Sequence, residues 1–162
     1  MGHRNTLLAM LIATPAIAID GNAQAHDLVI HDPWVREVPP VADDSAGYLR
    51  IENRGDNDAT LIDGESEQFE RVELHESIEE DGTMRMHHHD EVVVPAGGDV
   101  AMEPGGYHVM LIGRQGDPLQ EGDNVTFTLR LADGNTVNIT APVMRYGPDG
   151  DADDDMDHHD HH

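Results

Sequence analysis

Methionine and histidine are concentrated in three short stretches of the chain. The stretch "TMRMHHHD", residues 83–90, holds two methionines and three histidines. His108 and Met110 lie together in "YHVML", and His75 follows the strand-like stretch "FERVEL". A thioether sulfur is a soft, neutral ligand and an imidazole nitrogen is of borderline softness, so a site built from both favours copper(I) over zinc, calcium or magnesium.

The spacing of His108 and Met110 predicts that their side chains share one face of a strand, because alternate residues of a strand point to the same side. Val109 and Leu111 would then point to the other side, into the core. A histidine and a methionine on one face are two of the ligands that a metal site needs. Taken alone, the pair is more simply interpreted as a gap-filling methionine beside a hydrogen-bonded surface histidine.

The stretch "TMRMHHH" is harder to explain without a metal. As a strand it places Met84, Met86 and His88 on one face, while Arg85, His87 and His89 share the other. Residues 69–89 are interpreted as strand, loop and strand, in which the loop "ESIEEDG" brings His75 near Met84 or Met86. Three segments can therefore supply ligands to one cluster.

The chain contains no cysteine, which narrows the chemistry of such a cluster. Zinc sites normally draw on cysteine, histidine and carboxylate, and a blue-copper electron carrier requires a cysteine thiolate. A thioether needs no deprotonation and cannot form a disulfide in an oxidising compartment. The residues therefore favour a protein that holds copper(I) outside the cytoplasm over one that carries electrons.

The elements that must position these residues are short strands separated by turn residues. No segment shows a sustained helical period of 3.6 residues, and the last two strands are joined by "ADGN", a hairpin turn signal. This spacing predicts an all-β protein, an antiparallel β-sandwich or barrel. The strand-like stretches are "DLVIHDPWV", "AGYLRIEN", "ATLIDG", "FERVELHES", "GTMRMHHH", "EVVVPAGG", "GGYHVMLIG", "NVTFTLRL" and "NTVNITAPV".

Both ends of the chain are predicted to lie outside this single folded domain, residues 26–146. Arg4, an apolar run over residues 7–18 and the sequence Ala23-Gln24-Ala25 are typical of a secretory signal peptide, residues 1–25, so we expect a periplasmic protein. No other apolar run is long enough to cross a bilayer. Residues 147–162 are acidic, rich in histidine and nearly devoid of apolar residues, which predicts a disordered tail. A native tail is favoured over a purification tag, because Asp160 interrupts its histidines.

The net charge of the chain is −24, from 33 acidic residues against nine arginines and no lysine. Such a field repels nucleic acid and anionic lipid, so neither is expected as a partner. An acidic, halophilic type of surface accounts for the charge, because salt screens the self-repulsion. Attraction of cations or of a basic docking partner is a second interpretation, compatible with the first.

The order and spacing His75-x10-Met86-x21-His108-x-Met110 resemble the signature of the periplasmic copper chaperones called PCuAC. The flanking stretches "VELH", "GTMRM", "PGGYHVMLIG" and "PLQEGDNVTFTLRLADG" are similar to that family, as are "HDPWVR" and "GYLRIENRGDNDATLI". The resemblance covers residues 28–143, essentially the whole predicted domain.

The resemblance implies a cupredoxin-like Greek-key β-sandwich or barrel with copper(I) bound by His75, Met86, His108 and Met110. Met84 is expected next to the ligands or in the core. The implied function is delivery of copper to a copper-accepting subunit of respiratory cytochrome oxidase or to another copper chaperone. Family members with a His/Met-rich extension bind additional copper there, which implies copper(II) binding by five tail residues: Met156, His158, His159, His161 and His162.

The triplet of residues 87–89 is not part of the signature; it is either an auxiliary site or polar decoration, and decoration is favoured. A periplasmic copper buffer or resistance protein would use the same ligands. An enzyme is disfavoured, because the chain has no nucleophile elbow, no metallopeptidase His/Glu motif and no cysteine nucleophile. A purely structural β-sandwich that carries no metal is the remaining alternative.

Overall fold

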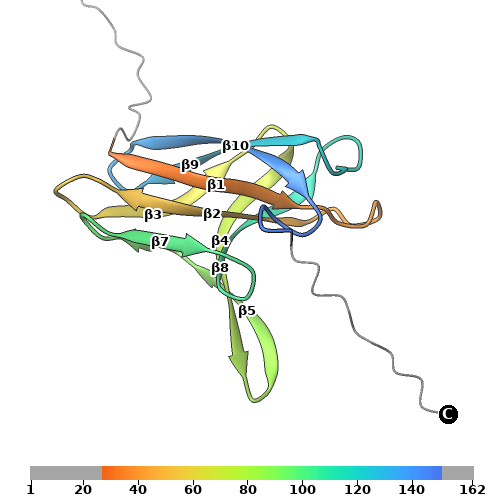
Figure 1. Cartoon of the computed structure of the whole chain (residues 1–162), viewed down its shortest axis with the longest axis horizontal. Coiled ribbons are helices and arrows are strands. Elements are labelled where there is room, and N and C mark those ends of the chain that lie inside the picture. Colours follow the sequence, from red (N-terminus) through yellow and green to blue (C-terminus); the bar gives the residue numbers. More distant parts are fainter. Residues whose placement is uncertain (1–26, 151–162) are drawn as a thin grey trace, which may run out of the picture.

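The computed structural model describes residues 27–150, which form ten β-strands and no helix (Figure 1). Within this range, no helix is long and apolar enough to cross a membrane. The strands are β1 (Leu28–Arg36), β2 (Ser45–Asn53), β3 (Ala59–Glu65), β4 (Phe69–Glu80), β5 (Thr83–His89), β6 (Val92–Val94), β7 (Asp99–Met102), β8 (Tyr107–Arg114), β9 (Asn124–Leu131) and β10 (Thr136–Met144).

Seven of these strands close into a barrel. Their order is β4-β8-β2-β1-β10-β9-β3, and β3 pairs back onto β4. The pairing of β1 with β10 is parallel and the other barrel pairings are antiparallel. Of the remaining strands, β5 pairs with β4, β6 with β3, and β7 with β2. The expected all-β sandwich or barrel is confirmed as a barrel.

The closure of the barrel depends on the missing side chain of Gly64. This residue pairs with Val72 across the β3–β4 contact. A Cβ atom at Gly64 would lie 2.6 Å from the carbonyl oxygen of Thr128 and 2.8 Å from Cγ1 of Val72. Both separations are shorter than van der Waals contact, so β3 can approach its neighbours this closely only with glycine here.

The barrel interior follows the alternation of the strands. Val109 and Leu111 of β8 are fully buried, as the sequence predicts, together with Phe127 and Leu129 of β9. His108 is also buried, at 3% exposure, although its side chain lies on the opposite face of β8 from Val109. Strand β8 therefore carries buried side chains on both faces at this point, with His108 next to the ring of Tyr48 at 6.3 Å between centroids.

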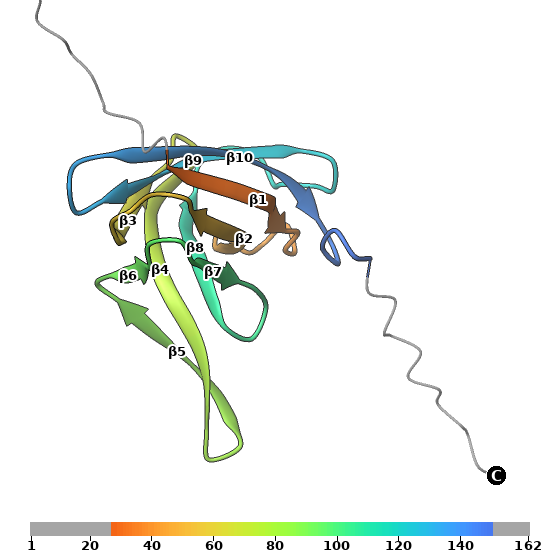
Figure 2. The same ribbon diagram turned by 60° about the vertical axis from the view of Figure 1, so that its left-hand side comes forward.

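The β4–β5 hairpin extends beyond the barrel as a long two-stranded arm (Figures 1 and 2). The expected loop "ESIEEDG" is wrong: β4 continues to Glu80, and Asp81 and Gly82 alone make the turn. Both turn residues have positive φ, 53° and 78°, which is the geometry of a type I′ hairpin turn. The arm therefore has a fixed register over its whole length.

One strand was not predicted from the sequence, and the predictions for the two ends of the chain are not tested. Strand β7 was not expected, since its four residues show no alternation of apolar and polar side chains. Residues 147–150 form turns after β10, but the predicted signal peptide 1–25 and the tail residues 151–162 lie outside the described residues. The domain boundaries and the tail's disorder therefore stay predictions.

Candidate metal site

Three histidines lie in a row across three neighbouring strands. His75 of β4 pairs with His108 of β8 on one side and with His88 of β5 on the other. The ring centroids of His75 and His108 are 5.9 Å apart, and those of His75 and His88 are 5.5 Å apart. Directly paired residues of a sheet point to the same face, so all three imidazoles lie on one side of the β5–β4–β8 sheet.

The two predicted methionine ligands lie on the same face. Met110 pairs with Glu73 and Met86 with Ser77, so each is two residues along its strand from a partner of His75. Such diagonal neighbours are typically about 7–8 Å apart, within reach of a long, flexible methionine side chain. The structure thus brings residues of all three chain segments to one face. Met84 lies two residue pairs farther towards the tip of the hairpin than Met86.

Each of the two inner histidines has one ring nitrogen fixed by a hydrogen bond. His108 Nδ1 lies 3.2 Å from the carbonyl oxygen of Gly106, which can only accept, so Nδ1 donates. His75 Nε2 lies 2.8 Å from the carboxylate Oε2 of Glu73 and donates to it. The other nitrogens, His108 Nε2 and His75 Nδ1, are buried and have no hydrogen-bond partner among residues 27–150.

Buried polar atoms without a partner are costly, and they are typical of positions where a ligand belongs. With the proton held on one nitrogen, the other carries a free lone pair, which is the arrangement that metal-binding histidines adopt. The hydrogen bonds thus prepare one donor atom on His75 and one on His108.

Electrostatics keep the site ready for a cation. Burial lowers the pKa of His108, and the neighbouring His75 lowers it further, although the bond to Gly106 opposes the shift. His108 is therefore neutral at neutral pH, as a ligand must be. The hydrogen bond from His75, with smaller contributions from Arg71 and from His88, lowers the pKa of Glu73 below its usual value, so this carboxylate stays ionised.

The site runs from the interior to the surface. His108 is 3% exposed, the His75 side chain 15%, and Met86, on the hairpin, 60%. A metal at this face would be held by the barrel on one side and be open to a partner on the other.

The histidine triplet divides between the two faces of the hairpin. His88 lies on the same face as His75, while His87 and His89 point to the opposite face towards carboxylates of β4. His89 Nε2 lies 2.7 Å from Glu76 Oε2, and His87 Nε2 lies 3.2 Å from Glu80 Oε1. The structure thus separates His88, on the face of His75, from His87 and His89, and both interpretations of the triplet stay predictions.

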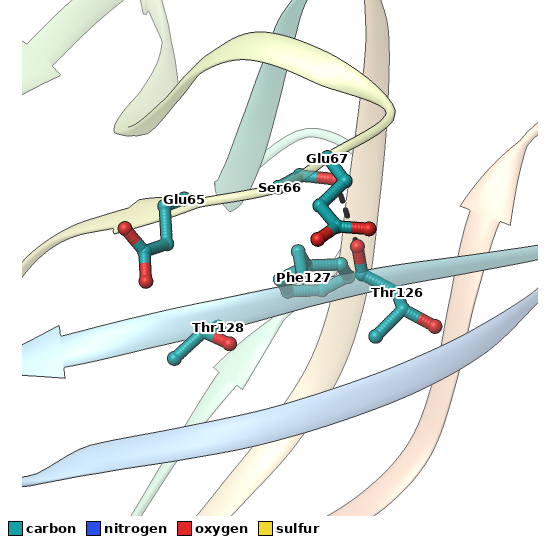
Figure 3. A pocket seen from close by; sticks show the side chains of 6 residues that line it. All are labelled: Glu65, Ser66, Glu67, Thr126, Phe127 and Thr128. Carbon is teal, nitrogen blue, oxygen red and sulfur yellow. Dashed lines mark hydrogen bonds between the residues drawn. The ribbon is translucent and has the colours of Figure 1, made fainter. Parts of the chain in front are cut away.

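A separate cavity of about 450 Å³ lies between β9 and the connection from β3 to β4 (Figure 3). Its lining is Glu65, Ser66, Glu67, Thr126, Phe127 and Thr128, without histidine or methionine. The Ser66 hydroxyl donates to the carbonyl oxygen of Thr126, at 2.8 Å. In the part of the chain that the structure describes, no three His, Asp, Glu or Cys side chains are grouped to hold a metal by themselves.

Comparisons with known proteins find similar proteins over most of the described residues. The family model "Putative lipoprotein LpqE-like" matches residues 28–143. The relative "Putative lipoprotein Lxx21020" of Leifsonia xyli is 28% identical over 141 residues, which are 86% of this chain and 83% of that protein.

Two solved structures that are similar to this chain are described as copper-bound. The copper-bound PCuAC domain from PmoF2 is 26% identical, with a TM-score of 0.60, over 72% of this chain and 92% of that domain. The CuI form of DR1885 from Deinococcus radiodurans is 30% identical, with a TM-score of 0.58, over 72% of this chain and 77% of that protein. The resemblance found in the sequence is confirmed: the chain belongs to the LpqE-like family, which is the PCuAC family of copper-chaperone-like proteins.

Proposed function

We propose that this protein is a copper chaperone that binds one copper(I) ion through His75, Met86, His108 and Met110. The observation that carries the proposal is the pair of unpartnered, buried ring nitrogens on His75 and His108, on the same sheet face as the two methionines. Each nitrogen has its lone pair free because the other nitrogen of its ring donates a hydrogen bond.

The donor set supports copper(I) as the cargo. Two neutral imidazoles and two neutral thioethers suit a soft monovalent ion and add no charge that would favour a harder divalent one. The relatives with bound copper support the same choice, one of them described with CuI.

The burial gradient supports transfer in preference to catalysis. An acceptor can approach Met86 at the surface, replace its sulfur and take the ion stepwise, while His108 still holds the ion from below. Copper then moves down a gradient of affinity without release into solvent. We propose no enzymatic activity for this site.

The proposed acceptor is the copper centre of a respiratory oxidase or a second chaperone, reached in the periplasm. The predicted signal peptide supports export, and a family described as lipoproteins is consistent with it. Deletion of the gene tests this: loss of oxidase activity at limiting copper supports delivery, whereas copper sensitivity with normal oxidase supports the buffering alternative.

A competition titration with a copper(I) chelator tests the ligands. The wild-type chain should bind about one tight equivalent, and this tight binding should be lost when His108→Ala and Met110→Ala are combined. His89→Ala is the matched control, because that imidazole faces the other side of the hairpin. Unchanged affinity in the double variant would refute the assignment, and X-ray absorption without mixed sulfur and nitrogen scattering would contradict the donor set.

The tail is a separate proposal, because Met156 and four histidines of residues 158–162 lie outside the described residues. Imidazoles among aspartates favour copper(II). Truncation of residues 147–162 should abolish copper(II) binding and leave copper(I) binding intact, and copper(II) binding that survives truncation would contradict this.

A further inference from the structure

We propose that His88 is a fifth copper ligand, which forms an outer copper(I) position together with His75 and Met86. This inference rests on the proposed function and deepens it. Copper would occupy an inner position, with His108 and Met110, or the outer one, and would pass between them through the shared ligands.

The register of the hairpin carries the inference. His88 pairs directly with His75, and Met86 lies two residues before His88 on the same face. With a metal–nitrogen bond of about 2 Å, two imidazoles on one metal have ring centres roughly 5–6 Å apart. The His75–His88 separation of 5.5 Å meets this condition as well as the His75–His108 separation of 5.9 Å does.

The hydrogen bond of His75 makes the two positions exclusive. Its Nε2 is engaged with Glu73, so only Nδ1 is free to bind a metal. A single donor atom cannot serve both positions at full strength. The face therefore holds one copper ion that alternates between His108 and His88, with the His75 ring between them.

The surroundings of His88 mark it as the outward end of this path. Its side chain is 52% exposed, and it lines an open groove of about 460 Å³. The same groove is lined by four carboxylates and two guanidinium groups: Asp63, Glu70, Glu73, Asp90, Arg71 and Arg130. The excess of negative charge attracts a cation to the side of the site where His88 lies.

The other two members of the triplet provide matched controls. His87 and His89 are on the same strand but face away, near Glu80 and Glu76. A substitution of His87 changes the charge and composition of the hairpin as much as a substitution of His88 does, but leaves the proposed ligand face intact.

The test is an anaerobic copper(I) competition titration of the full chain with a chromophoric chelator. We expect His108→Ala to bind one equivalent more weakly than wild type, at the outer position. Adding His88→Ala should weaken copper(I) binding further, by at least roughly tenfold. A tenfold loss of affinity is the lower end of the range seen when a hydrogen-bond partner of a metal ligand is removed, and removal of a ligand should cost at least as much. Adding His87→Ala should have no further effect, and this comparison also cancels any contribution of the tail histidines.

Equal affinities for the His88→Ala/His108→Ala and His87→Ala/His108→Ala chains would overturn the outer position while leaving the chaperone proposal standing. Failure of the wild-type chain to bind copper(I) would overturn both. Because His108 is buried and its substitution can unfold the chain, the single variants give a second test. Chelator should extract copper several-fold more slowly from His88→Ala than from His87→Ala, and equal rates overturn the relay.

Discussion

The hydrogen bond from His75 to Glu73 gives the sharpest prediction about the site. In Glu73→Ala, the His75 ring loses the acceptor that holds its proton on Nε2. The proton can then reside on Nδ1, and the ring can turn to find another partner. Copper binding must reverse both changes, so the affinity for copper(I) should fall.

The size of the effect follows from the burial of the pair. A hydrogen bond to a charged group contributes about 1.5–3 kcal/mol. The side chains of His75 and Glu73 are 15% and 24% exposed, so water screens part of this and the lower end applies. About 1.4 kcal/mol corresponds to a tenfold change in a dissociation constant, so we expect a loss of roughly tenfold. That value lies within the range observed when partners of metal-binding histidines are removed.

The matched control is Glu76→Ala. Glu76 is on the same strand and binds His89 at 2.7 Å, but on the opposite face. Copper(I) competition titrations of both variants, with circular dichroism to verify folding, should show the loss in Glu73→Ala alone. Wild-type affinity in a folded Glu73→Ala chain, or equal losses in both variants, would refute the claim that this bond prepares the ligand.

Further predictions concern the barrel and its surface. Gly64→Ala should destabilise the fold by about 1–3 kcal/mol, because the added Cβ would overlap Thr128 and Val72. Gly47→Ala is the control, because its Cβ would meet only ordinary contacts at 3.6 Å. Equal thermal unfolding midpoints for the two variants would contradict this prediction. Hydrogen bonds from Arg54 and from His31 lower the pKa of Glu52 to about 2. Its stabilising contribution is thus complete above the ordinary carboxyl pKa and is lost as the pH falls towards 2, and carboxyl NMR shifts should give a midpoint near 2 that rises in Arg54→Ala.

Much of this structure could be predicted from local patterns. The parity of His108 and Met110 against Val109 and Leu111 places two ligand candidates on one face and two residues in the core, and the strand spacing predicts an all-β barrel or sandwich. The pairing of distant strands was not predictable in this way, because it depends on contacts between residues far apart in the sequence. The residue types suggest one cluster drawn from three segments, but only the family resemblance supplies the four-ligand set that joins His75 to His108.

The main error in the site came from one dipeptide. Asp81-Gly82 is a hairpin turn signal of the same kind as the Asp-Gly in "ADGN", whereas the sequence interpretation places it at the end of a seven-residue loop. A two-residue turn fixes the register and places His88, not Met84 or Met86, directly opposite His75. Strand β7 was missed because a four-residue edge strand has too few positions to show a period.

The hairpin strand that carries Met86 is joined to the rest of the sheet along one edge. Within residues 27–150, β5 pairs with β4 alone, and its other edge is free. Such an arm should open locally at a much smaller free-energy cost than the barrel. A copper ion held by β8 and β5 together would fasten the arm to the barrel, since a ligand that binds only the closed form stabilises it. Amide hydrogens of β5 should therefore exchange more slowly in the copper-bound protein. The loaded and empty forms would then differ in the rigidity of the arm, a difference that an acceptor can recognise.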